Sequence, residues 1–435
     1  EALAARAVAG WGGRLAVLRP AAVIAGDGGE PPARRLLRRL VPSPAGWAPP
    51  LQFLAAEDLG TAVRAVLERG GEGVYHVAPR GVVPAREAAR LAGARRLPLP
   101  AALLRLLGVA SAAELAYLRH PWTVSDRRLR ALGWAPRLSS AEALSAATKR
   151  RARAPKALEY DDHGMDTAYI DAYGRTLFRF LSRAYWRIES RGLEQVPRAG
   201  AAVLAGVHRG FMPWDGVMTL HLVRQATGRV IRFLIHPCLV KQPFLATHMR
   251  KLGGVVAARE NADARLARGE LLGVYPEGIR GAFTPYRRAY RLGRFGRDEY
   301  VRMALRHGAP IVPFVTVGSA EIYPILGRVD GAWVRRALEW PYFPICPNFP
   351  LPGPPLPSKW HTRFLAPLEV GRRYPPEAAE DLEVVHEISR EVRGRLEEAM
   401  HEMLRRRRHV FWGSVFDDAG AVPGLAAAAE DRRAS

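Results

Sequence analysis

A histidine and an aspartate that follow one apolar segment are the residues best suited to acid–base chemistry. Ala202–Val207 has the length of a buried strand, His208 follows it directly, and Asp215 comes seven positions later across a loop with glycine and proline. A histidine can remove the proton of a substrate hydroxyl, and a carboxylate on its other nitrogen fixes the tautomer and stabilises the cation. A loop histidine beside a helix-capping aspartate is the alternative, and the spacing alone leaves both interpretations open.

Two later segments offer groups that bind anions. Arg259 follows the short apolar stretch 253–258, and its planar guanidinium suits a phosphate, although this segment alone favours a surface arginine that caps or pairs with the next helix. The apolar run that begins at Leu271 ends in a turn with exposed backbone N–H groups, a carboxylate and an arginine, namely Tyr275, Pro276, Glu277, Gly278 and Arg280. Such a turn can hold an oxyanion or a phosphate, and a plain strand-ending turn is the alternative.

The elements that must position these residues alternate strand and helix. Before residue 139 the pattern predicts strands at 15–18 and 73–77 and a helix at 58–69. After residue 164 it predicts strands at 202–207, 230–235, 271–275 and 311–317, of which the last carries Pro310 and Pro313 and is expected at an edge or irregular position. Spacings of three and four predict one long amphipathic helix through Leu382, Val385, Ile388, Val392, Leu396, Met400 and Met403.

A shift in composition divides the chain. Residues 139–163 pass from an alanine-rich helix through a basic run to a polar stretch, which is typical of a linker. We expect domains at 1–147 and 165–410, a linker at 148–164 and a tail at 411–435, all of α/β class. The first residue is Glu1 and the sequence opens in a helical pattern, so we interpret the chain as a fragment that lacks its true N-terminus.

The order and spacing of the segments around His208, Arg259, Tyr275–Arg280 and Ile311–Val317 resemble the motif blocks of the glycerolipid and lysophospholipid acyltransferase superfamily (PlsC-like). The resemblance covers residues ~165–405 and implies an α/β domain with a mixed, largely parallel sheet. By this resemblance His208 is the general base and Asp215 its partner. The substrate-binding residues would be Arg259, Tyr275, Pro276, Glu277, Gly278 and Arg280.

The resemblance implies direct transfer of a fatty acyl group from acyl-CoA or acyl carrier protein to the hydroxyl of a glycerolipid or lysophospholipid, without a metal or organic cofactor. One feature departs from the common pattern, in which four residues separate His and Asp. Here six intervene, and Pro213 stands where the aspartate is expected. This form resembles the branch of monoacylglycerol and diacylglycerol acyltransferases, whose neutral acceptors place different demands on Arg259 and Arg280 than a phosphorylated lysolipid does.

Residues ~1–147 resemble the C-terminal half of an extended short-chain dehydrogenase, the family of sugar-nucleotide epimerases and reductases. The matching pieces are Leu18–Pro20 with Gly26, Leu51–Leu54 with Glu57–Leu59, Gly73–Val77, and Asp126–Leu129 with Leu132–Pro136. The resemblance implies a partial Rossmann-like dehydrogenase remnant. The Gly-rich phosphate turn and the Tyr-x-x-x-Lys pair of that family lie upstream of the matched segment, and without them this half cannot cradle a dinucleotide.

We therefore expect no cofactor-binding residues in this chain, and NAD(P) only if the missing half is present. Gly26–Gly29 is interpreted as a plain loop. An NAD(P)-dependent nucleotide-sugar epimerase or reductase-type fusion, with an accessory acyltransferase-like half, is the alternative function. A catalytically inactive lipid-binding module is a third.

The charge balance calls for an anionic partner. Net charge is +23, and nearly all the basic residues are arginine, which also reflects the coding bias of a GC-rich bacterial genome. No nucleic-acid recognition motif accompanies the charge, and His236, Cys238 and His248 lack paired metal-ligand spacing. No apolar run reaches the ~20 residues of a membrane-spanning helix. We expect a cytoplasmic protein, bound peripherally to the anionic inner face of the cytoplasmic membrane.

Two aromatic segments are candidates for lipid contact. Trp340–Pro357 is rich in proline and aromatic residues and predicts either a hydrophobic lip or a buried loop. Arg405–Arg408 followed by Val410–Trp412 predicts either an interfacial anchor or a solvated helix end.

Overall fold

The computed structural model describes residues 14–25, 40–120, 123–148, 163–296, 298–347 and 353–416. The chain divides into two compact units, Glu1–Asp171 with Leu239–Gly254, and Ala172–Cys238 with Val255–Ser435. The predicted domain boundaries at 147 and 165 stay predictions. The loop at 26–29 and residues 149–162 of the predicted linker lie outside the described residues.

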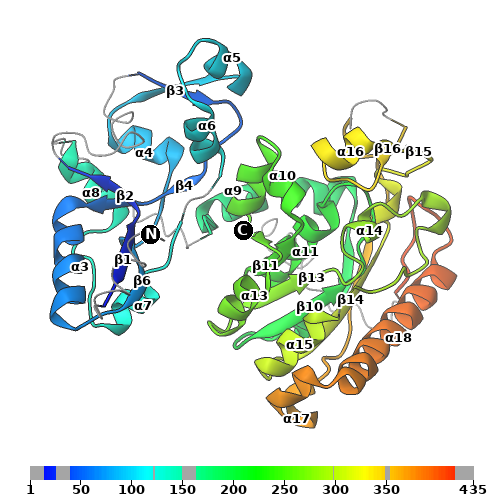
Figure 1. Ribbon diagram of the computed structural model, residues 1–435. Coiled ribbons are helices and arrows are strands. Elements are labelled where there is room, and N and C mark those ends of the chain that lie inside the picture. Colours follow the sequence, from blue (N-terminus) through cyan, green and yellow to red (C-terminus); the bar gives the residue numbers. More distant parts are fainter. Residues whose placement is uncertain are drawn as a thin grey trace, which may run out of the picture. The chain divides into compact units, whose positions relative to one another are not determined.

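The first unit is built from short paired strands and helices (Figure 1). Its described strands are β1 (Ala16–Pro20), β2 (Ala22–Ile24), β3 (Leu40–Pro44), β4 (Pro50–Leu51), β5 (Phe53–Ala55), β6 (Gly73–Val77), β7 (Val83–Pro84) and β8 (Arg95–Leu99). Its helices include α3 (Ala56–Glu68), α4 (Ala85–Leu91), α5 (Ala101–Leu106), α6 (Ala112–Arg119), α7 (Arg127–Ala131), α8 (Ser140–Ala147) and α12 (Leu245–Lys251). Pairs β1–β6, β2–β5 and β3–β8 are parallel, which agrees with a Rossmann-like remnant.

Buried Asp58 in α3 shows why a polar residue of the first unit sits in its interior. Its carboxylate accepts hydrogen bonds from the backbone N–H groups of Arg137 (3.0 Å) and Leu138 (3.1 Å). These bonds satisfy a charge that burial would otherwise penalise, and they tie α3 to a segment 79 residues later in the chain.

The second unit is organised around a seven-stranded sheet of order β12-β11-β13-β10-β14-β17-β9 (Figure 1). The strands are β9 (Glu189–Arg191), β10 (Ala202–Gly206), β11 (Ile231–Ile235), β12 (Val255–Val256), β13 (Leu271–Val274), β14 (Ile311–Val317) and β17 (His361–Phe364), with a separate pair β15 (Gly327–Val329) and β16 (Phe343–Ile345). All neighbours in the large sheet are parallel except β14 and β17. The predicted mixed, largely parallel sheet is confirmed.

Helices cover both faces of this sheet. The helices of the second unit are α10 (Leu177–Phe180), α11 (Trp214–Thr227), α13 (Arg259–Leu266), α14 (Ile279–Ala282), α15 (Glu299–Arg306), α16 (Ala332–Ala337), α17 (Val370–Arg373) and α18 (Leu382–Arg406), while α9 (Thr167–Arg175) crosses the boundary between the units. Residues of α13, α15 and α18 pack with alternate residues of β10 such as Val203 and Ala205. Gly216 of α11 lies against Tyr275 and Phe233, on the other face.

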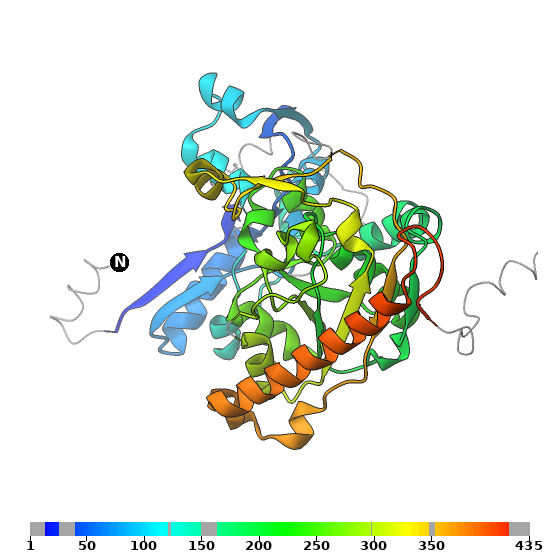
Figure 2. The same cartoon turned by 90° about the vertical axis from the view of Figure 1, so that its right-hand side faces the viewer.

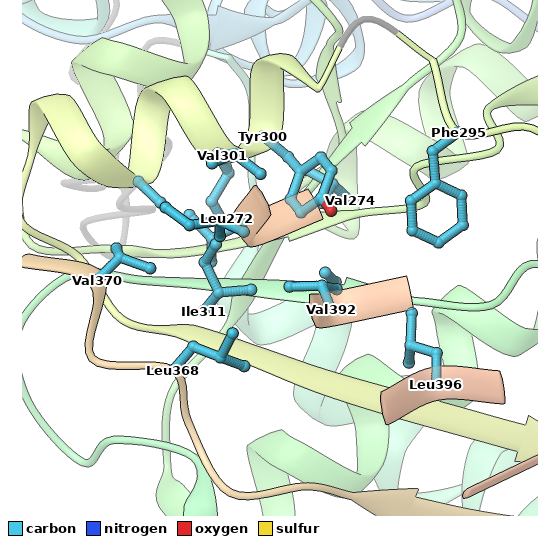
Figure 3. Close-up of a cluster of buried hydrophobic side chains, with 14 of the residues drawn as sticks. Leu272, Val274, Phe295, Tyr300, Val301, Ile311, Leu368, Val370, Val392 and Leu396 are labelled. Carbon is cyan, nitrogen blue, oxygen red and sulfur yellow. The ribbon is translucent and has the colours of Figure 1, made fainter. Parts of the chain in front are cut away.

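The predicted long helix is α18, and it covers the core of the second unit (Figures 2 and 3). Asp381 caps its first turn by accepting the N–H of Glu383 at 2.9 Å. Figure 3 shows Val392 of α18 beside Ile311 of β14, and Leu396 of α18 and Val301 of α15 belong to the same core. Six of the seven predicted apolar positions are buried; Leu382 is exposed because it is the first residue of the helix.

The expected edge position of the proline-containing strand is wrong. β14 lies between β10 and β17, inside the sheet. The expected irregularity is present, because the pairing of Phe314 with Phe364 and the bridge of Ile311 with Leu368 leave an uneven segment opposite Pro313. Pro313 accepts a hydrogen bond from Leu365 there, and a residue without an N–H fits where the ladder is interrupted.

The chain stays packed beyond the predicted end of the second domain at residue 410. Val415 is buried in the core of the second unit, and Arg187 donates to the carbonyl of Phe411 at 2.8 Å. The predicted tail lies outside the described residues from 417 onward. No helix in the described part of the chain is long and apolar enough to cross a membrane.

Candidate active site

The second unit brings His208 and Asp215 into direct contact. β10 ends at Gly206 and delivers His208, while Asp215 is the second residue of α11 and is 1% exposed. The distance from His208 Nδ1 to Asp215 Oδ2 is 2.6 Å. Because an ionised carboxylate only accepts, Nδ1 carries the hydrogen and Nε2 is left as the basic nitrogen.

Backbone groups hold the aspartate in place. Its Oδ2 also accepts the N–H of Arg209 at 3.0 Å, and its Oδ1 accepts the N–H of Gly216 at 2.8 Å. Pro213, not Asp215, occupies the N-cap of α11. The aspartate therefore orients the imidazole as well as satisfying helix-end donors.

Aromatic rings form one wall of the site. The ring of Tyr275 stacks on that of His208 with centroids 4.6 Å apart, and Phe233 stacks on Tyr275 at 5.5 Å. Burial of the hydroxyl, followed by the negative charge of Asp215, raises the pKa of Tyr275 well above its ordinary value. Tyr275 thus stays neutral and restricts the imidazole to one plane.

A buried ion pair lies directly behind the histidine. Arg209 and Glu277 have side chains 1% and 3% exposed, and Arg209 Nη1 is 2.6 Å from Glu277 Oε2. Arg209 also donates to the carbonyls of His208 (2.6 Å), Ala289 and Arg291 (3.0 Å). The pair is fully bonded, as a buried pair must be, and it fixes the backbone at His208.

The other carboxylate oxygen of Glu277, Oε1, helps to hold the loop 285–296 in place. Gly293 donates its N–H to Glu277 Oε1 at 2.6 Å, and Arg393 of α18 donates to the carbonyl of Leu292 at 3.0 Å. Glu277 was expected to meet substrate. Its carboxylate is instead occupied by Arg209 and Gly293, and the arginine that holds it was not singled out from the sequence because nothing in its spacing distinguishes it from a surface arginine.

The turn after β13 lies beside His208. Gly278 has φ +58° and ψ −151°, a conformation that essentially only glycine adopts, and its N–H donates to the carbonyl of Tyr275 at 2.8 Å. The carbonyl of Pro276 accepts the N–H of Gly296 at 2.9 Å. A Cβ placed on Gly281 would lie 3.1 Å from the carbonyl oxygen of His208, so α14 packs directly on this histidine.

The two predicted anion-binding arginines are placed differently. Arg280 is exposed on α14, next to the turn that abuts His208. Arg259 is the exposed first residue of α13, and its Nε lies 3.6 Å from Asp263. It follows β12, which β11 and β13 separate from β10, so it sits about 14 Å across the sheet from the histidine strand.

A cluster of aromatic side chains adjoins the loop that carries His208. Phe211, three residues after His208, contacts Phe283 and Trp340 with ring centroids 5.3 and 4.9 Å apart. Tyr342 meets Phe283 edge to face at 5.4 Å, and its hydroxyl donates to the carbonyl of Phe283. The predicted lip at Trp340 is thus half-buried against the loop that carries His208.

The comparisons with known proteins concern this same region. A family model described as Acyltransferase matches residues 187–317. An uncharacterized protein of Mycobacterium tuberculosis is 38% identical over 259 residues, which are 58% of this chain and 72% of that protein. Phytyl ester synthase 1, a chloroplastic protein of Arabidopsis thaliana, is 26% identical over 253 residues, which are 52% of this chain and 36% of that protein.

Solved structures also resemble parts of the chain. PlsC, the 1-acyl-sn-glycerophosphate (LPA) acyltransferase of Thermotoga maritima, has a TM-score of 0.37 and 20% identity, and the match covers 57% of this chain and 81% of that one. The UDP-glucose 4-epimerase of Thermus thermophilus has a TM-score of 0.27 and 19% identity, over 34% of this chain and 49% of that one. The matched family segment holds the strand, loop and turn that carry His208, Asp215 and Glu277.

Proposed function

The chain belongs to the acyltransferase family, and from this premise we propose that it transfers a fatty acyl group from acyl-CoA or acyl carrier protein to the hydroxyl of a glycerolipid or lysophospholipid. The observation that carries the proposal is the His208–Asp215 pair at the end of a buried strand, with Nδ1 bonded to the carboxylate at 2.6 Å. This arrangement leaves Nε2 to accept the proton of an incoming hydroxyl.

The reaction proceeds by direct transfer. The acceptor hydroxyl gives its proton to His208 Nε2 while its oxygen attacks the thioester carbonyl carbon. The tetrahedral intermediate then expels the thiolate as the carbon–sulfur bond breaks, and the imidazolium returns the proton to that sulfur. An ester and a free thiol result, and His208 is regenerated; general-base assistance of this kind contributes about 10²–10⁴-fold.

The residues around His208 orient it, position its backbone and bind a phosphate of the substrates. Asp215 fixes the tautomer of His208 and stabilises its cation, and Tyr275 holds the ring plane. Glu277 acts through Arg209 by positioning the backbone at His208. Pro276 and Gly278 shape the turn, and Arg280 contributes positive charge to a phosphate of donor or acceptor.

Arg259 would bind a phosphate away from the reacting atoms. Its exposed guanidinium lies at the carboxyl end of β12, where ligands of open α/β sheets commonly bind. About 14 Å from the histidine strand, it suits a phosphate remote from the reacting ester rather than one adjacent to it.

The acceptor is a lipid alcohol. The six residues between His208 and Asp215 resemble the monoacylglycerol and diacylglycerol acyltransferase branch. The similarity to a protein named phytyl ester synthase adds a long-chain alcohol to the acceptors worth testing. Since such acceptors reside in a bilayer and the chain carries a net charge of +23, we place the protein peripherally on the inner face of the cytoplasmic membrane.

The test is acceptor-dependent release of thiol. The purified chain is incubated with long-chain acyl-CoA or acyl carrier protein and one of lysophosphatidate, other lysolipids, monoacylglycerol, diacylglycerol or phytol, and the ester is identified by mass spectrometry. Thiol release that requires one acceptor and matches ester formation supports the proposal and names the acceptor. If no pair of donor and acceptor reacts, the enzymatic role is rejected in favour of lipid binding.

A further inference from the structure

An excursion from the second unit, residues 326–345, carries apolar side chains that no core covers. It comprises β15, α16 and β16, and it projects beside α14, at the opposite end of the unit from α17 (Figures 1 and 2). Leu326 is 67% exposed and Trp333 is 57% exposed, and Val329 is also exposed. Grouped exposed apolar side chains on one element mark an interaction surface.

The same surface is strongly basic. Arg335 and Arg336 are exposed on α16. A surface cavity of about 600 Å³ lies where the excursion meets the loop 285–291, and it is lined by Pro285, Arg287, Arg288, Arg291, Ile325, Leu326, Gly327, Arg328 and Tyr342. None of the lining residues is acidic, and the acidic residues of the excursion are Glu339 and Asp330, which lies 3.1 Å from Arg328.

These chemistries match the two layers of a membrane surface. Guanidinium groups bind phosphates bidentately, and arginines beside an anionic leaflet are attracted to it. Tryptophan and leucine enter the boundary between headgroups and acyl chains, where arginine stems lie alongside them. An acidic protein partner would pair with the arginines, but its charged surface would not bury the exposed side chains of Leu326 and Trp333 as a bilayer does.

The surface is joined to the catalytic loop by the aromatic cluster. Tyr342 at the end of the excursion donates to the carbonyl of Phe283, and Trp340 contacts both Phe283 and Phe211. Phe211 follows His208 by three residues. An acceptor that leaves the bilayer at this surface meets apolar rings on its way to the histidine.

We propose that residues 326–345 and the adjoining arginines of 285–291 are the surface by which the protein docks on an anionic lipid bilayer. The inference rests on the proposed function only in that the bilayer supplies the acceptor; the binding itself is measured without turnover. Lipid phosphates occupy the arginine-lined cavity, and Leu326 and Trp333 enter the interfacial layer.

The binding test uses co-sedimentation with vesicles of phosphatidylglycerol and phosphatidylcholine, and with vesicles of phosphatidylcholine alone. The wild type binds the anionic vesicles far more strongly, and this preference weakens as salt is raised. Arg335→Ala/Arg336→Ala lowers the partition coefficient roughly 30-fold, from the attraction of two arginines to an anionic surface. Leu326→Ser/Trp333→Ser lowers binding to anionic vesicles and leaves the salt dependence unchanged.

The matched control removes two exposed arginines at the other end of the unit. Arg372→Ala/Arg373→Ala on α17 changes the net charge equally, and it shifts the partition coefficient less than about two-fold, because α17 lies at the opposite end of the unit from the docked surface and salt screens the attraction of distant exposed charges. Equal losses in the control and in Arg335→Ala/Arg336→Ala overturn the proposal in favour of non-specific attraction. Wild-type binding indifferent to lipid charge overturns it as well.

A second assay separates this inference from the proposed reaction. Turnover is measured with the acceptor in anionic vesicles and with the acceptor dispersed in detergent. Arg335→Ala/Arg336→Ala loses turnover only on vesicles. Equal turnover of this variant and the wild type on vesicles overturns the docking surface, whereas a wild type that binds vesicles but turns over neither form of acceptor rejects the reaction and retains the surface.

Discussion

Breaking the buried Arg209–Glu277 pair should cost the second unit much of its stability. In Arg209→Met the carboxylate of Glu277 stays buried at 3% exposure with only the N–H of Gly293 as a partner, and the carbonyls of His208, Ala289 and Arg291 lose their donor. An uncompensated buried charge costs about 3–5 kcal/mol. Glu277→Gln retains an acceptor for Gly293 and should cost about 2–3 kcal/mol.

Because the two residues bond to each other, their effects should not add. Arg209→Met/Glu277→Gln leaves no unpaired charge, so its loss should fall short of the sum of the single losses by about 2 kcal/mol. The assay is urea unfolding followed by tryptophan fluorescence, since six of the ten tryptophans belong to the second unit. Turnover should also fall in each variant, because Arg209 holds the backbone of His208.

The control is a surface ion pair of similar length. Arg373 and Glu391 lie 2.8 Å apart but are partly exposed, so Arg373→Met should cost less than about 1 kcal/mol. Additive losses in the double variant, or a loss in Arg209→Met no larger than in Arg373→Met, would refute the reasoning that the pair is a fully desolvated unit.

Three further predictions concern single residues of the second unit. Asp215→Asn should lower kcat about 10²–10⁴-fold, because the amide no longer fixes the imidazole tautomer; retained kcat in steady-state assays would contradict this role. Gly281→Ala should lower kcat, because its Cβ would press on the carbonyl oxygen of His208 at 3.1 Å, whereas Gly394→Ala in α18 has open space and should stabilise by about 0.5–1 kcal/mol in urea unfolding. Burial lowers the pKa of His221 to about 4, whereas in the unfolded chain its pKa is about 6.5. The unfolded chain therefore binds a proton at His221 more readily than the folded chain does. The free energy of unfolding is unaffected by this residue above about pH 6.5 and decreases as pH falls toward 4. His221→Phe should therefore flatten the fall of melting temperature across this window, and an unchanged slope would exclude His221 as its source.

The pattern of the sequence predicted those features that local chemistry determines. The buried strand before His208 and the length of β14 follow from apolar runs, and α18 follows from its three–four spacing. The contact of His208 with Asp215 was one of two interpretations that the spacing left open; it forms because α11 begins beside the end of β10 and returns the aspartate to the histidine.

Features that depend on three-dimensional pairing could not be predicted in this way. Arg209 is separated from Glu277 by 68 residues, and only the adjacency of β10 and β13 brings them together. Pro313 was expected at a sheet edge. The sequence does not show that the ladder between β14 and β17 is interrupted at this position, which lets a proline lie inside the sheet. Arg259 and Arg280 both follow a predicted strand, so the sequence does not distinguish them. Only the order of strands in the sheet shows that Arg259 is remote from His208 and that Arg280 lies near it.

The most direct test of the central claim is the rate of acceptor-dependent thiol release in His208→Ala, compared with the wild type and with His401→Ala, which removes an exposed histidine of α18. His208→Ala should lose at least about 100-fold in kcat, the ester product should fall in parallel, and His401→Ala should match the wild type. Equal rates of ester formation in His208→Ala and the wild type would contradict the assignment of His208 as the general base.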